Sequence, residues 1–217
     1  MDIYTAMKQR KSARAYLDKP VARQDIEEIF KYAGLAPSAI NLQPWEFIVT
    51  YGEEKDRLVR RILKARAEKQ VACGPGTAKP LPRKFAKRSL DALAVMEPPI
   101  SRLGMTFNQF IEEGSCSFYG APIVIIVTID KIFPSIRYLD AGLAVSYLLL
   151  AAHARGLATC PIGIITAYAA DIADVLNIPE EKEIILGIAL GYADESSPAN
   201  SFKTSRGNTA EIMTWYE

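Results

Sequence analysis

The 217-residue sequence has little of the residue types that carry metal and nucleophile chemistry. It contains one histidine, His153, and three cysteines, Cys73, Cys116 and Cys160, without a CxxC or another metal-ligand spacing. We therefore expect neither a metal site nor a disulfide framework. Scattered cysteines are typical of proteins kept in a reducing compartment, which predicts a cytoplasmic location.

An excess of charge of one sign is also missing. The chain has 26 Lys and Arg against 25 Asp and Glu, a net charge of +1, so no global field attracts nucleic acid or a membrane surface. The N-terminus lacks the apolar core of a signal peptide. The longest apolar stretch, 141–154, is short and flanked by Asp140 and Arg155. We interpret it as a buried core helix rather than a membrane span.

Three sequence signatures of common active sites are absent. No G-x-G-x-x-G follows a strand and no G-x-x-x-x-G-K occurs, so both standard phosphate cradles are missing. No G-x-S-x-G nucleophile elbow occurs either. Because His153 lies in the most apolar predicted helix, we interpret it as a core or interface residue and do not expect a Ser-His or Cys-His nucleophile.

Hydrophobic periodicity predicts helices and strands that do not alternate regularly, which indicates the α+β class. Asp2 caps a first helix that ends around 10–14, and a second helix repeats apolar residues from Ile26 to Ala33. The remaining predicted elements are helices at 53–69, 138–155 and 169–176 and strands at 46–51, 122–129 and 183–190. The 138–155 helix is apolar nearly all round and must be buried in a core or a subunit interface.

We expect one domain over 1–217, with two appended parts. The Gly/Pro-rich segment 73–83 cannot continue a helix, and we interpret 71–118 as a variable, lid-like insertion that Pro98-Pro99 breaks in two. The polar tail 192–217 is expected to form a C-terminal arm.

The first candidate site is the basic cluster Arg10-Lys11-Ser12-Ala13-Arg14. If the cluster is helical, Arg10 and Arg14 lie one turn apart and share a face. Two guanidinium groups and a hydroxyl suit a phosphate monoester. A solvated helix end, where cations complement the helix dipole, is the alternative.

The second candidate site is the loop that opens the stretch APSAINLQPWEFIV, residues 36–49. Pro37 and Pro44 restrict its backbone, while Ser38, Asn41 and Gln43 offer hydrogen-bonding groups that could read the edge of a flat heterocycle. A capped connection from a helix to a strand is the alternative.

Two further signals come later in the chain. The predicted turn Cys160-Pro161-Ile162-Gly163 lets the backbone approach a ligand closely, and a nucleophilic Cys160 is the less favoured interpretation. Lys203 and Arg206 stand in the polar tail, where plain solvation is the alternative.

These signals occur in the order and spacing of one family. The sequence resembles the FMN-dependent nitroreductase family through RKSAR, APSAINLQPWEFIV, YLLLAAHARGLATCPIG and LGYADESSPANSFKTSR. The resemblance covers 1–70 and 119–217, and the segment between them matches only loosely. FYGAPIVIIVTID and the C-terminal motif are most similar to the nitrobenzoate-reductase-like branch.

The resemblance implies a nitroreductase-like fold: a central mixed, mostly antiparallel sheet flanked by helices, in an intertwined homodimer. One FMN would bind in each site, and each site would be built from both subunits. The implied FMN contacts are Arg10, Ser12 and Arg14 at the phosphate and ring edge, Lys11 through its backbone, Pro37, Ser38 and Asn41 from the partner subunit, Pro161, Ile162 and Gly163 along the isoalloxazine, and Arg206 at the phosphate.

Two departures from the family pattern limit these assignments. Many relatives place a lysine two residues before the tail arginine, whereas this chain has Thr204 there and a lysine at Lys203. The resemblance therefore favours Arg206 over Lys203. The asparagine that contacts the flavin pyrimidine in the family has no clear counterpart here, and Asn108 is the nearest candidate.

The resemblance further implies ping-pong transfer of electrons from NADH or NADPH to a nitroaromatic, a quinone or a similar planar acceptor. The flavin carries this chemistry, so no catalytic side chain is expected. Phe107 and Phe110, within a lid at 98–118, are candidates to stack on the acceptor. Reductive dehalogenation, flavin destruction and a flavin-binding redox module without fast turnover are the alternatives.

Overall fold

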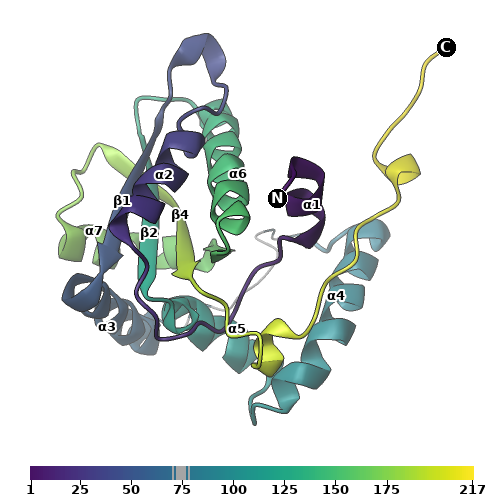
Figure 1. Cartoon of the computed structure of the whole chain (residues 1–217), viewed down its shortest axis with the longest axis horizontal. Coiled ribbons are helices and arrows are strands. Elements are labelled where there is room, and N and C mark those ends of the chain that lie inside the picture. The colour runs from purple at the N-terminus through teal and green to yellow at the C-terminus, as the bar shows by residue number, and fades with distance from the viewer. Residues whose placement is uncertain (70, 72–76, 78) are drawn as a thin grey trace.

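The computed structural model describes residues 1–69, 71, 77 and 79–217. A four-stranded sheet in the order β1-β2-β4-β3 forms the centre of the chain, and each neighbouring pair is antiparallel (Figure 1). The strands are β1 (Trp45–Tyr51), β2 (Ile123–Asp130), β3 (Ala158–Ile162) and β4 (Lys182–Gly191). Cys73 and four other residues of the Gly/Pro-rich segment 73–83 lie outside the described residues.

Seven helices surround this sheet in the described residues, which confirms the α+β class. Their bounds are α1 (Ile3–Gln9), α2 (Arg23–Ala33), α3 (Gly52–Lys69), α4 (Arg83–Ser101), α5 (Phe107–Cys116), α6 (Tyr138–Ala154) and α7 (Ala169–Leu176). The expected helices at 53–69, 138–155 and 169–176 agree with α3, α6 and α7 to within one residue.

Strand β2 is the centre of two hydrophobic cores because successive side chains point to opposite faces of a sheet. Ile123, Ile125 and Val127 pack with α2 and α6 on one face, whereas Val124 and Ile126 pack with α3 and α7 on the other. All residues of β2 except the last are buried, as an unbroken β-branched run predicts for a strand covered on both faces.

The N-terminal helix is shorter than the sequence suggested. Asp2 caps α1 by accepting a hydrogen bond from the backbone of Thr5 at 3.0 Å, as expected, but the helix ends at Gln9. Residues 10–16 then run alongside the sheet, with a parallel bridge from Ser12 to Thr159. The helical spacing assumed for the basic cluster is therefore wrong. An extended chain also brings alternate residues to one side, so the three residues at 10, 12 and 14 still share a side.

The segment Cys160-Pro161-Ile162-Gly163 is not a turn. Its first three residues lie in β3, the edge strand that pairs with β4, and Gly163 follows the strand end. Proline is tolerated at a sheet edge because it lacks only a donor that the ladder can spare there.

Pro98 and Pro99 do not break the insertion in two, because both lie inside α4, which continues to Ser101. They stand in the last turn of that helix, and each lacks the N–H that would donate to the preceding turn. The interruption falls instead at 102–106, where Gly104 has a φ of +74°. The helices on either side share a small core formed by Met96, Ile100, Phe110 and Ala199.

The C-terminal segment passes beside α4 and then leaves the body of the chain (Figure 1). Its last residues include Ile212 and Trp215, with exposed fractions of 73% and 75%. Helix α6, with the turn before it, is long and apolar enough to cross a membrane by length and composition alone, a test that core helices also pass. We predicted that this helix is buried in a core or a subunit interface, and in the single chain Leu139 and Leu143 are 65% and 42% exposed.

Candidate functional site

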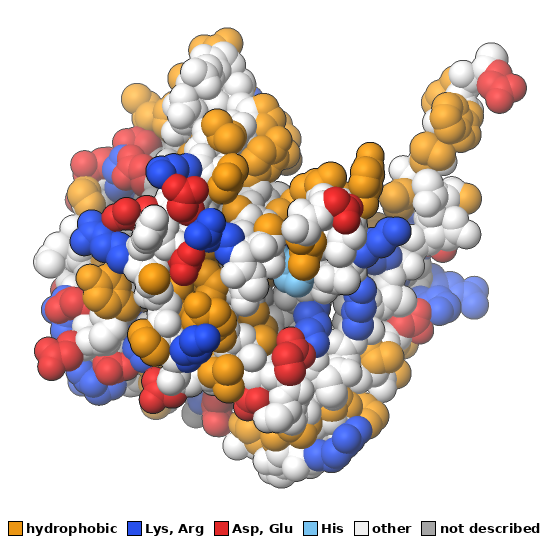
Figure 2. Space-filling model, in the orientation of Figure 1, with side chains coloured by type: hydrophobic (Ala, Val, Ile, Leu, Met, Phe, Trp, Pro, Cys, Tyr) orange, Lys and Arg blue, Asp and Glu red, His pale blue; other side chains and the backbone are white. Residues whose placement is uncertain are grey.

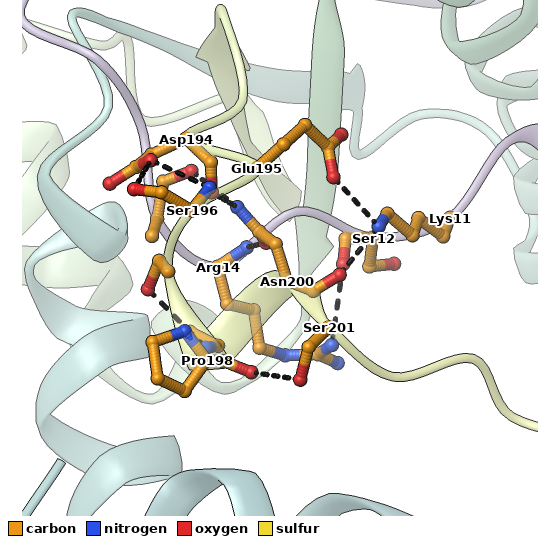
Figure 3. A network of polar contacts seen from close by, with 12 residues as sticks. Lys11, Ser12, Arg14, Asp194, Glu195, Ser196, Pro198, Asn200 and Ser201 are labelled. Atoms are coloured by element: carbon orange, nitrogen blue, oxygen red, sulfur yellow. Dashed lines mark hydrogen bonds and ion pairs between the residues drawn. The ribbon is translucent and has the colours of Figure 1, made fainter. Parts of the chain in front are cut away.

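The basic segment 10–14 is fixed between β3 and the C-terminal segment. The backbone N–H of Ala13 donates to the Thr159 carbonyl at 3.0 Å, and that of Arg14 donates to Asn200 Oδ1 at 2.7 Å (Figure 3). The Asn200 amide in turn donates to the carbonyls of Ala15 at 2.8 Å and Asp194 at 2.9 Å. Asn200 is 2% exposed, so this one side chain holds two distant parts of the chain together.

The Lys11 ammonium is satisfied within the protein. Its Nζ lies 3.1 Å from Glu195 Oε2 and 2.5 Å from the carbonyl oxygen of Asn200 (Figure 3). Any contact of Lys11 with a ligand therefore falls to its backbone, the role that the resemblance implied.

The Arg10 guanidinium is partly buried and has no counter-ion among the described residues. Its Nη1 is covered from solvent and has no hydrogen-bond partner among the described residues. Burial lowers the pKa of Arg10, and the neighbouring charge of Arg206 lowers it further. Two cations that repel each other favour an anion between them.

Arg14 stands on a platform of aromatic rings. Its guanidinium carbon lies 5.7 Å from the centre of the Phe202 ring and 6.0 Å from that of Tyr119, which is within the range of cation–π attraction. Nη1 donates to the Ser12 carbonyl at 3.4 Å, whereas Nε is buried without a partner. The rings orient the guanidinium and leave hydrogen-bonding capacity for a ligand.

These arginines fit the phosphate of FMN. Across the described ranges, no carboxylate lies within 4.0 Å of the Arg10, Arg14 or Arg206 guanidinium, although fifteen ion pairs form elsewhere. Buried donors without partners are costly, and a phosphate monoester supplies both the acceptors and the negative charge. A pocket of about 760 Å³, between α2 and the start of α3, is lined by none of the residues predicted to contact the flavin.

His153 lies next to this site, which the sequence did not indicate. It stands in the last turn of α6, and its Nε2 is buried without a partner in the described part of the chain. Burial lowers its pKa, and so does the charge of Arg10. We interpreted His153 as a core or interface residue, and that interpretation did not include its position beside Arg10. Asn200, Asp194 and Glu195 were missed too, although all three lie inside the motif GYADESSPANSF.

At the end of β3 the exposed groups that a ligand could contact are backbone groups rather than side chains. Ile162 is 4% exposed, with its side chain in the core, while Gly163 is open and a Cβ there would meet no atom within 4 Å. Cys160 is buried beneath Arg14 and Ser12, and burial raises the pKa of its thiol. A buried neutral thiol does not act as a nucleophile.

The loop 36–44 is held in a strained conformation. Ile40, Asn41 and Gln43 have φ values of +43°, +59° and +48°, a region that is costly for a β-branched residue such as isoleucine. The backbone of Gln43 donates to Ser38 Oγ at 3.0 Å, and its side chain donates to Asn41 Oδ1 at 3.1 Å. Ile40 is 90% exposed, so the strained conformation holds its side chain on a surface that no other part of the described chain covers.

One chain does not bring this loop to the arginines. Ala39 donates to Asp140 at the start of α6 at 3.4 Å, whereas His153, beside Arg10, lies in the last turn of the same helix. At a rise of 1.5 Å per residue these two ends are about 20 Å apart. Figure 1 shows the loop before β1 at the end of α6 that lies away from α1. Pro37, Ser38 and Asn41 therefore do not join the arginine cluster of their own chain.

The two basic residues of the C-terminal segment, Lys203 and Arg206, have different surroundings. Arg206 is exposed and binds only oxygens of its own loop, Thr204 and Ser205, at 3.0 to 3.2 Å. Lys203 donates to the carbonyl of Lys8 at the end of α1.

Of the two candidate stacking aromatics, Phe110 is 5% exposed. It packs against Tyr119 at 5.5 Å, so in this structure it offers no face to an acceptor, and that expectation is corrected. Phe107 is half-buried and stays a prediction, as does a flavin contact for the exposed Asn108.

Comparisons with known proteins identify the family of this chain. A model of the Nitroreductase family matches residues 7–192. The 4-nitrobenzoate reductase of Pseudomonas putida is 34% identical over 209 residues, 94% of this chain and 91% of that protein. The chloronitrobenzene nitroreductase of Comamonas testosteroni is 28% identical over 214 residues, 96% and 94% of the two chains.

Solved structures lead to the same group. The crystal structure of the FMN-dependent nitroreductase NfnB from Mycobacterium smegmatis in complex with NADPH has a TM-score of 0.88, with 27% identity and full coverage of both chains. With the family model spanning most of its length and its arginine cluster suited to a flavin phosphate, this chain belongs to the nitroreductase family.

Proposed function

We propose that this chain is an FMN-dependent oxidoreductase that passes electrons from NADPH or NADH to a nitroaromatic, quinone or similar planar acceptor. The observation that carries the proposal is the group of three arginines that have no counter-ion in the described part of the chain, where two of them also have buried donors without partners. When bound, FMN supplies the two-electron transfer, which explains why the sequence lacks a recognisable nucleophile. Membership of the nitroreductase family supports the reaction class.

The chain's own residues bind and orient the cofactor. The charges of Arg10 and Arg206 lie close enough to repel each other, and the two side chains are suited to hold the phosphate between them. Arg14, oriented by its aromatic platform, and Ser12 lie next along the extended segment and are suited to the ring edge. The open backbone at Gly163 gives a flat ring room to lie against the end of β3.

We further propose that the active form is a homodimer built on α6. Leu139, Leu143 and Tyr147 lie on one face of this helix and are 65%, 42% and 43% exposed. In a two-fold arrangement the same patch meets itself, so each α6 would lie against its partner in the opposite direction. The loop 36–44 at the start of one α6 would then approach Arg10 at the end of the other. This arrangement supplies the loop that a single chain does not bring to the arginines.

The exposed apolar residues of the C-terminal segment support the same assembly. Trp215 and Tyr216 are 75% and 94% exposed, which is unfavourable for large aromatic rings unless a second subunit covers them. We propose that 192–217 is an arm and that 71–118 is a lid over the acceptor, within one domain. A cytoplasmic location stays a prediction.

Anaerobic mixing of the FMN-loaded protein with NADPH or NADH tests the function. Loss of the oxidised flavin absorbance, and its return on adding 4-nitrobenzoate or a quinone, is the expected result. If neither nucleotide bleaches the flavin, the proposed function is wrong and a flavin-binding module is favoured. Return of absorbance with a halogenated phenol alone would favour reductive dehalogenation instead.

A further inference from the structure

A second basic pocket lies between α4 and the C-terminal segment. Its volume is about 640 Å³, and it is lined on one side by Lys84, Lys87, Arg88 and Asp91 of α4. Residues 204–208 and Glu211 of the C-terminal segment line the other side. Figure 2 shows basic side chains along α4 and the C-terminal segment.

The helix presents its cations to this pocket because of their spacing. Lys84, Lys87, Arg88 and Asp91 are three, four and seven residues apart, so they share one face of α4. Lys87 pairs with Asp91 at 2.7 Å, and Arg88 pairs with Glu211 at 2.7 Å. The Lys84 ammonium is bound only to a backbone carbonyl, that of Glu211, at 2.8 Å.

The pocket therefore carries an excess of positive charge. The three cations of α4 face two carboxylates, Asp91 and Glu211, which leaves one positive charge, and Arg206, which the pocket shares with the predicted flavin phosphate site, adds to it. Within the described residues, Lys84 and Arg206 form hydrogen bonds to neutral oxygens only. A phosphate monoester carries close to two negative charges at pH 7 and is attracted by this excess.

The pocket is distinct from the predicted flavin phosphate site. Arg10, Ser12 and Arg14 are not among its lining residues, and Arg206 alone borders both places. NADPH carries a phosphate group on its adenosine ribose, at the end of the molecule remote from the nicotinamide, and this group would occupy a solvent-open pocket outside the flavin site. NADH lacks that group.

We propose that this basic pocket, formed by Lys84, Lys87, Arg88 and Arg206, binds the 2′-phosphate of NADPH and makes NADPH the preferred electron donor. This inference rests on the proposed function. Asp91 and Glu211 hold the cations in place before the nucleotide arrives and are expected to exchange them for the phosphate.

The test is the rate of flavin reduction in FMN-loaded protein, measured anaerobically at increasing nucleotide concentration. We expect wild type to favour NADPH over NADH by about tenfold or more in second-order rate constant. The double variant K84Q/K87Q should lose most of this preference while its rate with NADH stays within twofold of wild type. Lys64→Gln, an exposed lysine on α3, is the matched control and should retain the preference.

The outcomes separate the two proposals. Bleaching by neither nucleotide refutes the proposed function and this inference with it. Bleaching at equal rates by NADPH and NADH in wild type refutes only this inference. A variant that binds FMN more weakly with an unchanged NADPH preference assigns the pocket to the flavin phosphate, which also overturns the inference.

A competition experiment tests the same proposal on the wild-type protein alone, so its result does not depend on whether a variant folds. Adenosine 2′-monophosphate should compete with NADPH about tenfold better than adenosine 5′-monophosphate, because the proposed pocket reads the phosphate at the 2′ position. Equal inhibition by the two nucleotides contradicts the proposal.

Discussion

Arg10 is the residue whose surroundings depend most on a ligand, since its Nη1 is buried without a partner and Arg206 adds a second positive charge. Replacing Arg10 by alanine removes one charge-assisted contact, worth about 1.5–3 kcal/mol. We expect Arg10→Ala to bind FMN about 10- to 150-fold more weakly, measured by fluorescence titration of the apoprotein. Arg60→Ala, on the exposed face of α3, should bind FMN as wild type does. Equal affinity in the two variants would show that the phosphate binds elsewhere.

Cys116 gives a pH dependence of stability with a definite sign. Burial raises the pKa of this thiol from 9.0 to about 11, so the folded state keeps a proton that the unfolded state releases. The contribution is complete below pH 9 and declines by about 2 kcal/mol as the pH approaches 11. We expect the difference in unfolding free energy between wild type and Cys116→Ala to shrink over this range in urea titrations. Parallel curves for the two proteins would contradict the assignment.

At the scale of elements, strongly periodic segments could be predicted and the connections between them could not. The run from Ile123 to Ile129 is apolar at every position, so a strand covered on both faces was the simple interpretation. The basic cluster was harder, because a helix and an extended chain both place residues 10 and 14 on one side. Only the pairing of Ser12 with Thr159, 147 positions along the chain, decides between them.

The β3 segment was misread for a related reason. A proline and a glycine close together are typical of turns. The sequence does not tell which strand will lie at a sheet edge, where Pro161 is tolerated. The role of Asn200 could not be predicted either, because its three hydrogen-bonding partners are backbone groups and carry no side-chain signal.

Asn200 supports a prediction about how the elements are joined. Truncating it leaves the Arg14 N–H and the carbonyls of Ala15 and Asp194 without partners in a buried place. We expect Asn200→Ala to lower the free energy of unfolding by about 2–4 kcal/mol in urea titrations and to weaken FMN binding as well. Asn108→Ala, at an exposed position, should stay within about 0.5 kcal/mol of wild type. An equally small loss at residue 200 would mean that the segment 10–14 is held by other contacts.

At the scale of the whole molecule, the separation of the loop 36–44 from the arginines makes the proposed site depend on two chains. Leu143 is 42% exposed on α6, and a glutamate there would place a charge in the proposed interface of both subunits. We expect Leu143→Glu to sediment as a monomer at micromolar concentration and to lose FMN. Leu63→Glu, at a leucine of α3 that is 37% exposed, should remain dimeric and yellow. A monomeric protein that keeps its flavin would refute the shared site.

The strained loop and the arginine cluster stand at opposite ends of α6, and this has a genetic consequence. Chains with Arg10→Ala would form dimers with two defective sites, and so would chains with a damaged Ser38–Asn41 loop. In a mixed dimer, both lesions fall in the same site, and the other site receives an intact cluster from one chain and an intact loop from the other. Two inactive variants, unfolded together and refolded as a mixture, should therefore regain flavin and part of the activity.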